Sequence, residues 1–229
     1  MRLPFGLLVL LPALAPAAAA RAQVGALQTD CRLGGERRDG STQFVVTCAG
    51  RSRSPDGRFA IVQRAYRFRQ PPVELQDGRG RTLARLRSLS DGMPLLVSWA
   101  PNSRRFFVNH HVGSFMDRVR LFEIVGRAAL ERRGLPRSAV RIATRRYPCL
   151  TRDWVYPEGV RWARDSRRIV LFTISSSYVC TELGPRRGSW HPLWMIGDVR
   201  SGRVEPGSIR VQRNDRPPQM PRGGPYSRL

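Results

Sequence analysis

The sequence GVRWARDSRRIVLFTI, residues 159–174, returns in this chain in two further versions. VSWAPNSRRFFV, residues 97–108, matches it almost position for position, and SPDGRFAIV, residues 54–62, is a shorter and earlier copy. Each version contains Asp or Asn followed by Ser or Gly, then arginine, then an apolar segment. Asp, Asn and Gly favour tight turns because they tolerate left-handed backbone angles. The repeat therefore predicts three β-hairpins.

The two arms of each hairpin differ in their hydrophobic pattern. In the third copy Val160 and Trp162 alternate with Arg161, and the second copy alternates in the same way up to Trp99. A period of two predicts a strand with one buried face, so we expect Val160 and Trp162 to share that face. The second arm, residues 169–172, is continuously apolar, which indicates a strand covered on both faces.

Further strands follow each hairpin, over residues 73–83, 119–126 and 193–204, and the first and third run through a glycine turn into another strand. Each unit is therefore expected to be a four-stranded antiparallel sheet. Ser54 and Ala100 occupy equivalent positions, and their spacing is typical of β-propellers, whose repeats are about 40–50 residues long.

The spacing between the second and third copies is longer, which predicts an insert. Residues 127–133 favour a helix, and Gly134 and Pro136 then interrupt it. Ser138 is suited to cap a second short helical turn that continues to Arg146. We therefore expect a short helical insert over residues 127–146.

The pattern Trp-x-Pro-Asp/Asn-Ser/Gly-Arg-Arg resembles the blade repeats of the Tol–Pal periplasmic propeller (TolB-like) and of prolyl-oligopeptidase-type peptidases. The resemblance covers roughly residues 45–212. It implies an all-β domain of propeller-like, four-stranded antiparallel blades over residues 23–212. Closed propellers of this kind have four or more blades, whereas three units are visible. The propeller is thus partial or open, or a degenerate unit lies near residues 23–50, or the chain pairs with another chain.

The two ends of the chain carry different signals. Residues 1–22 have a charged start, a Leu/Ala-rich apolar run and a small-x-small motif ending at Ala22, which together predict a cleaved signal peptide. We therefore expect a periplasmic or secreted protein. Residues 213–229 are rich in proline, glycine and arginine and predict a disordered tail.

Four cysteines remain after the predicted signal peptide: Cys31, Cys48, Cys149 and Cys180. An even count in an exported protein favours disulfide bonds. Local pairing, Cys31 with Cys48 and Cys149 with Cys180, is the simplest of the three possible connectivities.

The formal net charge is +23, and all 40 basic residues are arginine. Arginines occur along every predicted element, which indicates a solvated surface first. A weaker expectation is attraction to an anionic membrane surface or lipopolysaccharide. The sequence contains no recognisable nucleic-acid-binding motif, so nucleic acid is not an expected partner.

Catalytic signals are sparse. The absence of lysine excludes Schiff-base and Walker-type chemistry, and there is no G-x-S-x-G motif. His110 and His111 are adjacent, so on an extended chain they point to opposite sides and cannot easily share a metal ion. Asp117 is interpreted as an ordinary surface partner of arginine. No cofactor or metal site is predicted.

An aromatic cluster around the third repeat is the strongest feature suggestive of a site. Aromatic side chains on loops can stack on sugars or peptides, although tryptophans between propeller blades usually serve packing. The candidate ligand contacts are Trp154, Tyr156, Tyr178, Trp190, His191 and Trp194.

The sequence thus predicts an exported, non-catalytic interaction module that binds a protein or a cell-envelope component. Two alternatives stay open: an envelope hydrolase acting on peptide or glycan, with its site near Trp190 and His191, and a binder of anionic lipid or lipopolysaccharide. A hydrolase would need a histidine within hydrogen-bonding reach of a serine or carboxylate in a cleft.

Overall fold

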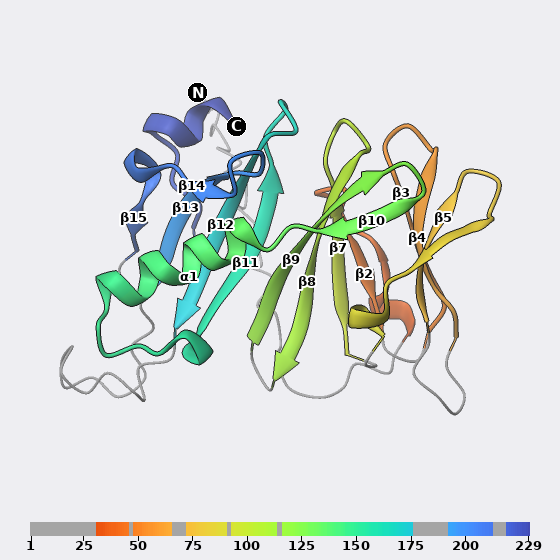
Figure 1. Ribbon diagram of the computed structural model, residues 1–229, viewed down its shortest axis with the longest axis horizontal. Helices are drawn as coiled ribbons and strands as arrows, with labels where there is room; N and C mark the ends of the chain where they lie inside the picture. Colours follow the sequence, from red (N-terminus) through yellow and green to blue (C-terminus); the bar gives the residue numbers. More distant parts are fainter. Residues whose placement is uncertain are drawn as a thin grey trace, which may run out of the picture.

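In the computed structural model, which describes residues 31–45, 48–65, 72–90, 93–113, 116–175, 192–212 and 219–229, the described residues form three antiparallel sheets and an α-helix. Figure 1 shows the sheets side by side, in the order N-terminal, central and C-terminal from right to left. The prediction of an all-β protein with antiparallel sheets is confirmed. The predicted signal peptide, residues 1–22, lies outside the described residues.

The three sheets follow the chain as successive meanders. The N-terminal sheet consists of β3 (Gly50–Arg53), β4 (Phe59–Gln63), β5 (Val73–Asp77) and β6 (Thr82–Arg85). The central sheet consists of β7 (Leu95–Trp99), β8 (Arg105–Gly113), β9 (Met116–Val125) and β10 (Ala128–Glu131), extended at β7 by β2 (Thr42–Phe44) and β1 (Gly35–Glu36). The C-terminal sheet consists of β11 (Val155–Trp162), β12 (Arg168–Ser175), β13 (Leu193–Asp198) and β14 (Arg203–Val204), with β15 (Arg210–Val211) also paired to β13.

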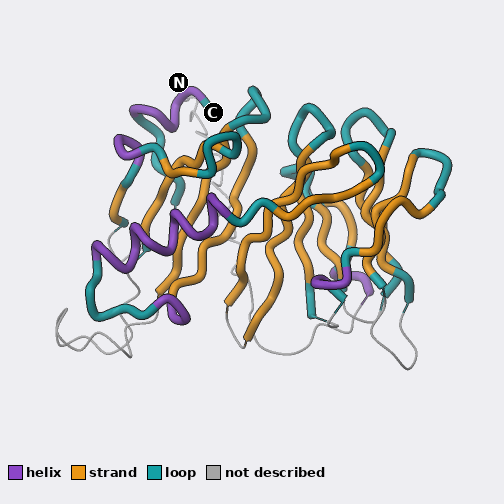
Figure 2. Tube along the Cα trace, viewed as in Figure 1, coloured by secondary structure: helices purple, strands orange, loops and turns teal. Residues whose placement is uncertain are grey.

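Helical segments connect and flank these sheets (Figure 2). Helix α1 (Gly134–Arg146) leads from the central to the C-terminal sheet. The short 3-10 helices are η1 (Cys31–Leu33), η2 (Arg87–Leu89), η3 (Arg152–Trp154), η6 (Pro206–Ser208) and η7 (Gly224–Arg228).

The three repeated sequences fold as the predicted hairpins, β3–β4, β7–β8 and β11–β12. The turn residue has a left-handed φ in every copy: +71° at Gly57, +59° at Ser103 and +56° at Ser166. A serine in this conformation is uncommon, and here both serines are buried and bond to the preceding repeat. The amide of Asp56 donates to Ser103 Oγ (3.0 Å), and the amide of Asn102 donates to Ser166 Oγ (2.9 Å).

The repeated tryptophans join each sheet to the one before it. Trp99 Nε1 donates to Ser52 Oγ on β3, and Trp162 Nε1 donates to the carbonyl oxygen of Ser98 on β7, both at 3.1 Å. Each indole is only 8% exposed. Trp99 and Trp162 are therefore packing residues between sheets, at equivalent places in successive repeats.

The expectation that Val160 shares a face with Trp162 is wrong. A β-bulge interrupts the pairing of β11 with β12 between Gly159 and Arg161. Such an irregularity changes the direction of the side chains around it. Val160 consequently packs on the outer face of the C-terminal sheet, whereas Trp162 packs toward the central sheet.

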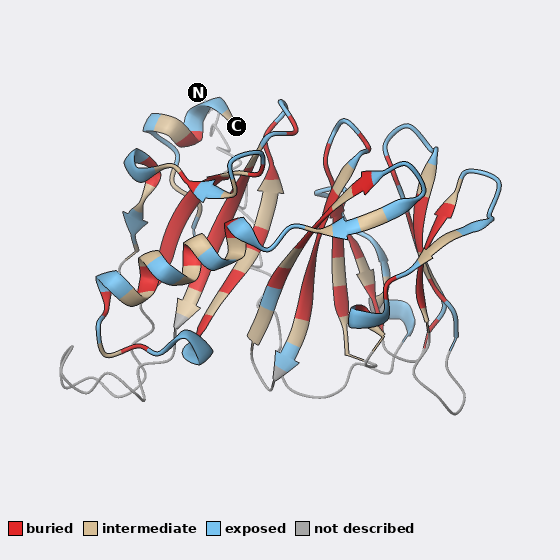
Figure 3. Ribbon diagram, viewed as in Figure 1, coloured by how far each residue is buried: buried red, intermediate tan, exposed pale blue. Residues whose placement is uncertain are grey.

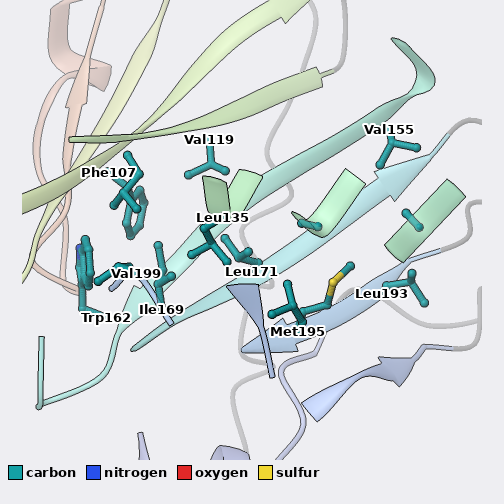
Figure 4. Packing of buried hydrophobic residues seen from close by; sticks show 14 of the residues in the cluster. Phe107, Val119, Leu135, Val155, Trp162, Ile169, Leu171, Leu193, Met195 and Val199 are labelled. Atoms are coloured by element: carbon teal, nitrogen blue, oxygen red, sulfur yellow. The ribbon is translucent and has the colours of Figure 1, made fainter. Parts of the chain in front are cut away.

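Two main cores fill the spaces between the sheets. One lies between the N-terminal and central sheets and includes Ile61, Leu75 and Phe106. The other lies between the central sheet, the C-terminal sheet and α1, as Figure 4 shows around Leu135 and Leu171. The close approach of the sheets needs glycine at position 159, because a Cβ atom there would lie 2.7 Å from the Phe107 ring.

The helical insert begins later than predicted. Residues 128–131 form strand β10, and α1 spans Gly134–Arg146. Gly126, at φ +60°, forms the turn that returns β10 against β9, and the Arg120–Glu131 pair (2.8 Å) links the two strands. These cross-strand contacts outweigh the helix propensity of residues 127–133. Pro136 fits in the first turn of α1, where backbone amides need no helical partner.

The end of the chain also differs from the prediction of a disordered tail over residues 213–229. Residues 219–229 pack on the C-terminal sheet (Figure 3). Tyr226 in this segment is only 2% exposed. Tyr226 Oη donates to the carbonyl oxygen of Ser208 (2.7 Å), and Arg161 donates to the backbone oxygen of Leu229 (2.8 Å). The physical reason is that apolar side chains in this segment match an apolar sheet face.

The predicted Cys31–Cys48 disulfide is present, with the two Cα atoms 5.6 Å apart. Cys149 is also disulfide-bonded, and its expected partner, Cys180, lies outside the described residues.

Candidate functional site

Strand β8 ends, and strands β9 and β11 begin, at the lower end of the sheets in Figure 1, and these strand ends carry several polar and aromatic residues. We call this group the lower-end site; it comprises His111, Asp117, Arg118, Trp154, Tyr156 and Glu158. β11 packs across β8 and β9 at this point. The side chain of Asn109 fixes the crossing, because its amide accepts from and donates to the backbone of Gly159, both at 2.8 Å.

The two adjacent histidines lie within β8 and have different surroundings. His111 and Asp117 are cross-strand partners, and His111 Nδ1 lies 2.9 Å from Asp117 Oδ1. His111 and Asp117 are both partly exposed, whereas His110 is only 6% exposed. Among the described residues, no group of three or more His, Cys, Asp or Glu side chains is placed to hold a metal ion.

Glu158 is the most perturbed carboxyl group of this site. Burial raises its pKa to about 8, and the negative charge of Asp117 acts in the same direction. A hydrogen bond from the backbone amide of Asp117 opposes both effects. At neutral pH Glu158 is thus largely protonated beside a carboxylate, an arrangement that allows it to donate a hydrogen bond or a proton.

Aromatic surface accompanies these polar groups. The Arg118 guanidinium lies 5.4 Å from the centre of the Tyr156 ring, within cation–π range. Trp154, on η3 immediately before β11, is 40% exposed. The structure therefore brings two of the predicted ligand-contact residues, Trp154 and Tyr156, to the same end of the molecule as the His111–Asp117 pair.

Trp194 does not belong to this surface. Its side chain is 4% exposed, its ring centre lies 4.6 Å from that of Phe172, and its Nε1 donates to Gln212 Oε1 (2.8 Å). It lies on a strand whose two faces are both covered, so its prediction as a ligand contact is corrected to a packing role. Tyr178, Trp190 and His191 lie outside the described residues.

Sequence reasoning missed four members of the lower-end site: His111, Asp117, Arg118 and Glu158. Strand β8 continues to Gly113, so His111 lies within a strand that pairs with β9. Extending the β8–β9 hairpin in register would have placed His111 opposite Asp117, which is the one signal available in the sequence. Glu158 and Asp117 belong to different sheets, so no pattern in the sequence around either residue predicts that they lie close together.

Arg118 and Trp154 of the lower-end site are exposed at the surface. Two depressions, of about 440 and 590 Å³, lie elsewhere, beside Val62 and beside Arg228 respectively. Neither is lined by a residue of the lower-end site. Exposed aromatic and arginine side chains are enriched where proteins contact other macromolecules.

No family model matches this chain, and no curated protein or solved structure gives a significant match. Within the described residues, none of the helices has the length and apolar character needed to cross a membrane.

Proposed function

We propose that this protein is an exported, propeller-like interaction module that binds a protein or a cell-envelope component through the lower-end site. Three successive antiparallel meanders, each opening with the same hairpin, support the propeller-like description. The Trp99 and Trp162 bonds to the preceding sheet support it further, because they repeat one geometry between neighbouring units.

The observation that carries the binding proposal is the Arg118–Tyr156 cation–π pair, with exposed Trp154 two residues before Tyr156, on a rigid support. Tryptophan, tyrosine and arginine are the residue types that dominate binding energy at protein interfaces. The support is rigid because Asn109 bonds the backbone of Gly159 twice. Side chains held in place before binding lose less conformational entropy when a partner arrives.

The experiment is a cross-linking pull-down of the purified protein from the envelope fraction of its own cells. Trp154→Ala and Tyr156→Ala should each reduce recovery of the bound partner at least tenfold, since central aromatic contacts contribute about 2 kcal/mol or more. Val125→Ala is the matched control, because Val125 is 50% exposed at the far end of β9.

The proposal is overturned if Val125→Ala lowers recovery as much as the two aromatic substitutions do. It is equally overturned if the parent protein recovers nothing above a bead control. Circular dichroism of all variants ensures that a loss of recovery reflects the surface and not the fold.

A second function, hydrolysis of peptide or glycan, is favoured by one observation: the protonated Glu158 beside the Asp117 carboxylate. A carboxyl group with a pKa near 8 could act as a general acid at neutral pH. Activity on such a substrate would then fall as the pH rises through about 8, because Glu158 loses its proton. If the protein is a hydrolase, Glu158→Gln would abolish turnover. If it only binds, neither the parent protein nor the Glu158→Gln variant shows turnover.

A further inference from the structure

Helix α1 carries a stripe of arginines on its outer surface. Its sequence, GLPRSAVRIATRR, contains no acidic residue. Leu135, Ala139 and Ala143 are buried against the sheets at intervals of four. Arg137, Arg141 and Arg145 are offset from them by two residues, which places them on the opposite face, and all three are exposed. We call these three residues the α1 stripe.

The α1 stripe has no acidic partner within the described part of the chain. By contrast, two arginines of the central sheet have acidic partners, in the pairs Arg105–Glu123 (2.7 Å) and Arg120–Glu131 (2.8 Å). Like charges four residues apart on a helix repel each other and destabilise it slightly. The stripe thus maintains a small repulsion that an external anionic partner would relieve.

The position of α1 leaves the stripe accessible. The helix lies along the flank of the C-terminal sheet, and its exposed face points away from the core (Figures 1 and 3). From Arg137 to Arg145 the stripe extends roughly 12 Å at 1.5 Å per residue. Charges in a straight row on a convex helix suit a broad, flat array of anions, whereas a single bound anion needs converging donors.

We propose that the α1 stripe docks the protein on an anionic membrane surface. The predicted signal peptide brings the chain to the cell envelope, where phospholipid headgroups supply a flat array of phosphates. Each arginine near such a surface adds about fivefold to the partition coefficient, so three give roughly 100-fold. Aromatic side chains for stacking bases are absent from α1 itself, which makes single-stranded nucleic acid a poorer partner.

The test is flotation of the purified protein with vesicles made of one part phosphatidylglycerol to two parts phosphatidylcholine. The salt concentration is about 0.1 M, where the Debye length is about 10 Å. The triple substitution Arg137→Gln, Arg141→Gln and Arg145→Gln should lower the partition coefficient roughly 100-fold. The corresponding triple lysine variant keeps the charge and should bind within about threefold of the parent.

The matched control removes the same charge from the N-terminal sheet, through glutamine at Arg51, Arg53 and Arg79, all exposed and remote from α1. An equal loss of binding in this control would show that net charge alone acts, and the proposal would be wrong. Equal flotation of the parent with pure phosphatidylcholine would also overturn it. The proposal would also be wrong if the glutamine variant of the stripe lost binding to a DNA duplex but kept its binding to vesicles.

This inference does not depend on the lower-end site. The glutamine variant of the stripe should recover the pull-down partner normally, and Trp154→Ala should leave the effect of the stripe unchanged. The two proposals can therefore fail separately.

Discussion

The outer faces of the N-terminal and C-terminal sheets end the stack in two different ways. On the N-terminal sheet, Glu74 is 3% exposed and accepts hydrogen bonds from Gln76 (3.2 Å) and Thr82 (3.0 Å). Arg64 and Arg85 lie 3.6 and 3.8 Å from its carboxylate. This outer face is polar, and the Glu74 carboxylate has hydrogen-bond donors and arginine side chains beside it on the same sheet or its flanking residues.

The C-terminal sheet presents an apolar outer face instead, formed by Val170, Phe172, Trp194 and Ile196. Residues 219–229 cover it with Met220, Tyr226 and Leu229. Two copies of one repeated unit can therefore end a stack either with a polar network or with a covering segment from the same chain. The repeat therefore specifies the faces between sheets and leaves the terminal faces to sequence outside the repeated motif.

Deleting residues 219–229 removes the segment that covers the outer face of the C-terminal sheet. The deletion exposes four large apolar side chains of the C-terminal sheet and should lower the free energy of unfolding by about 4–6 kcal/mol. Urea denaturation measures the loss, and size-exclusion chromatography should show self-association through the exposed face. If the shortened protein is monomeric and as stable as the full chain, residues 219–229 do not stabilise the C-terminal sheet or shield its outer face.

The tryptophans buried between the sheets show how much stability one packed aromatic side chain contributes, for comparison with the two terminal faces. Trp99→Ala and Trp162→Ala should each cost about 3–5 kcal/mol, because each deletes a buried indole that also donates a hydrogen bond. Trp154→Ala is the exposed control and should cost less than about 1 kcal/mol. Denaturant unfolding compares the three. A small loss for Trp162→Ala together with a large one for Trp154→Ala would reverse our assignment of core and surface.

Glu74→Gln tests whether the polar face contributes stability through its charge. The substitution keeps the shape of the side chain but removes the carboxylate that faces Arg64 and Arg85. We expect a loss of about 1–3 kcal/mol, the usual range for a buried charged group with hydrogen-bond partners. Glu36→Gln, on exposed β1, should change stability by less than about 0.5 kcal/mol. Equal effects in thermal unfolding would show that the network around Glu74 is not important.

Tyr226→Phe should give the smallest effect, about 1 kcal/mol. It leaves the ring in place over the C-terminal sheet and removes only the hydrogen bond to the carbonyl oxygen of Ser208. Burial raises the pKa of the Tyr226 hydroxyl, so it stays a donor throughout the ordinary pH range. Ser227→Ala, at the exposed neighbouring position, serves as the control in the same denaturant titration. A loss above about 3 kcal/mol would mean that the hydroxyl, more than the ring, holds the segment.

The sequence predicted the hairpins because turn chemistry is local. Asp56, Asn102 and Asp165 each accept a hydrogen bond from an arginine amide two residues later, and residue types alone reveal such turns. The boundary between β10 and α1 was mispredicted because strand pairing with β9 is a tertiary contact. The covering of the C-terminal sheet by residues 219–229 was missed for the same reason, since composition says nothing about a matching apolar face elsewhere.

The candidate site was predictable only in part. Trp154 and Tyr156 could be singled out as aromatic residues near a strand start. Trp194 was misassigned, although the run Leu193–Trp194–Met195–Ile196 already indicated a strand buried on both faces. Glu158 acquires its raised pKa from burial under a neighbouring sheet, which no pattern within β11 reveals.

The pairing of β2 with β7 has a consequence for the order in which the chain takes shape during synthesis. Thr42 on β2 lies opposite Val97 on β7, with the whole N-terminal sheet between them in sequence. A chain synthesised from its N-terminus presents β2 first, long before its pairing partner exists. The Cys31–Cys48 bond encloses β1 and β2 in one short loop and, once formed, restricts the conformations open to this hairpin. Strands β1 and β2 are thus synthesised first but can join the central sheet only after β7 has been synthesised.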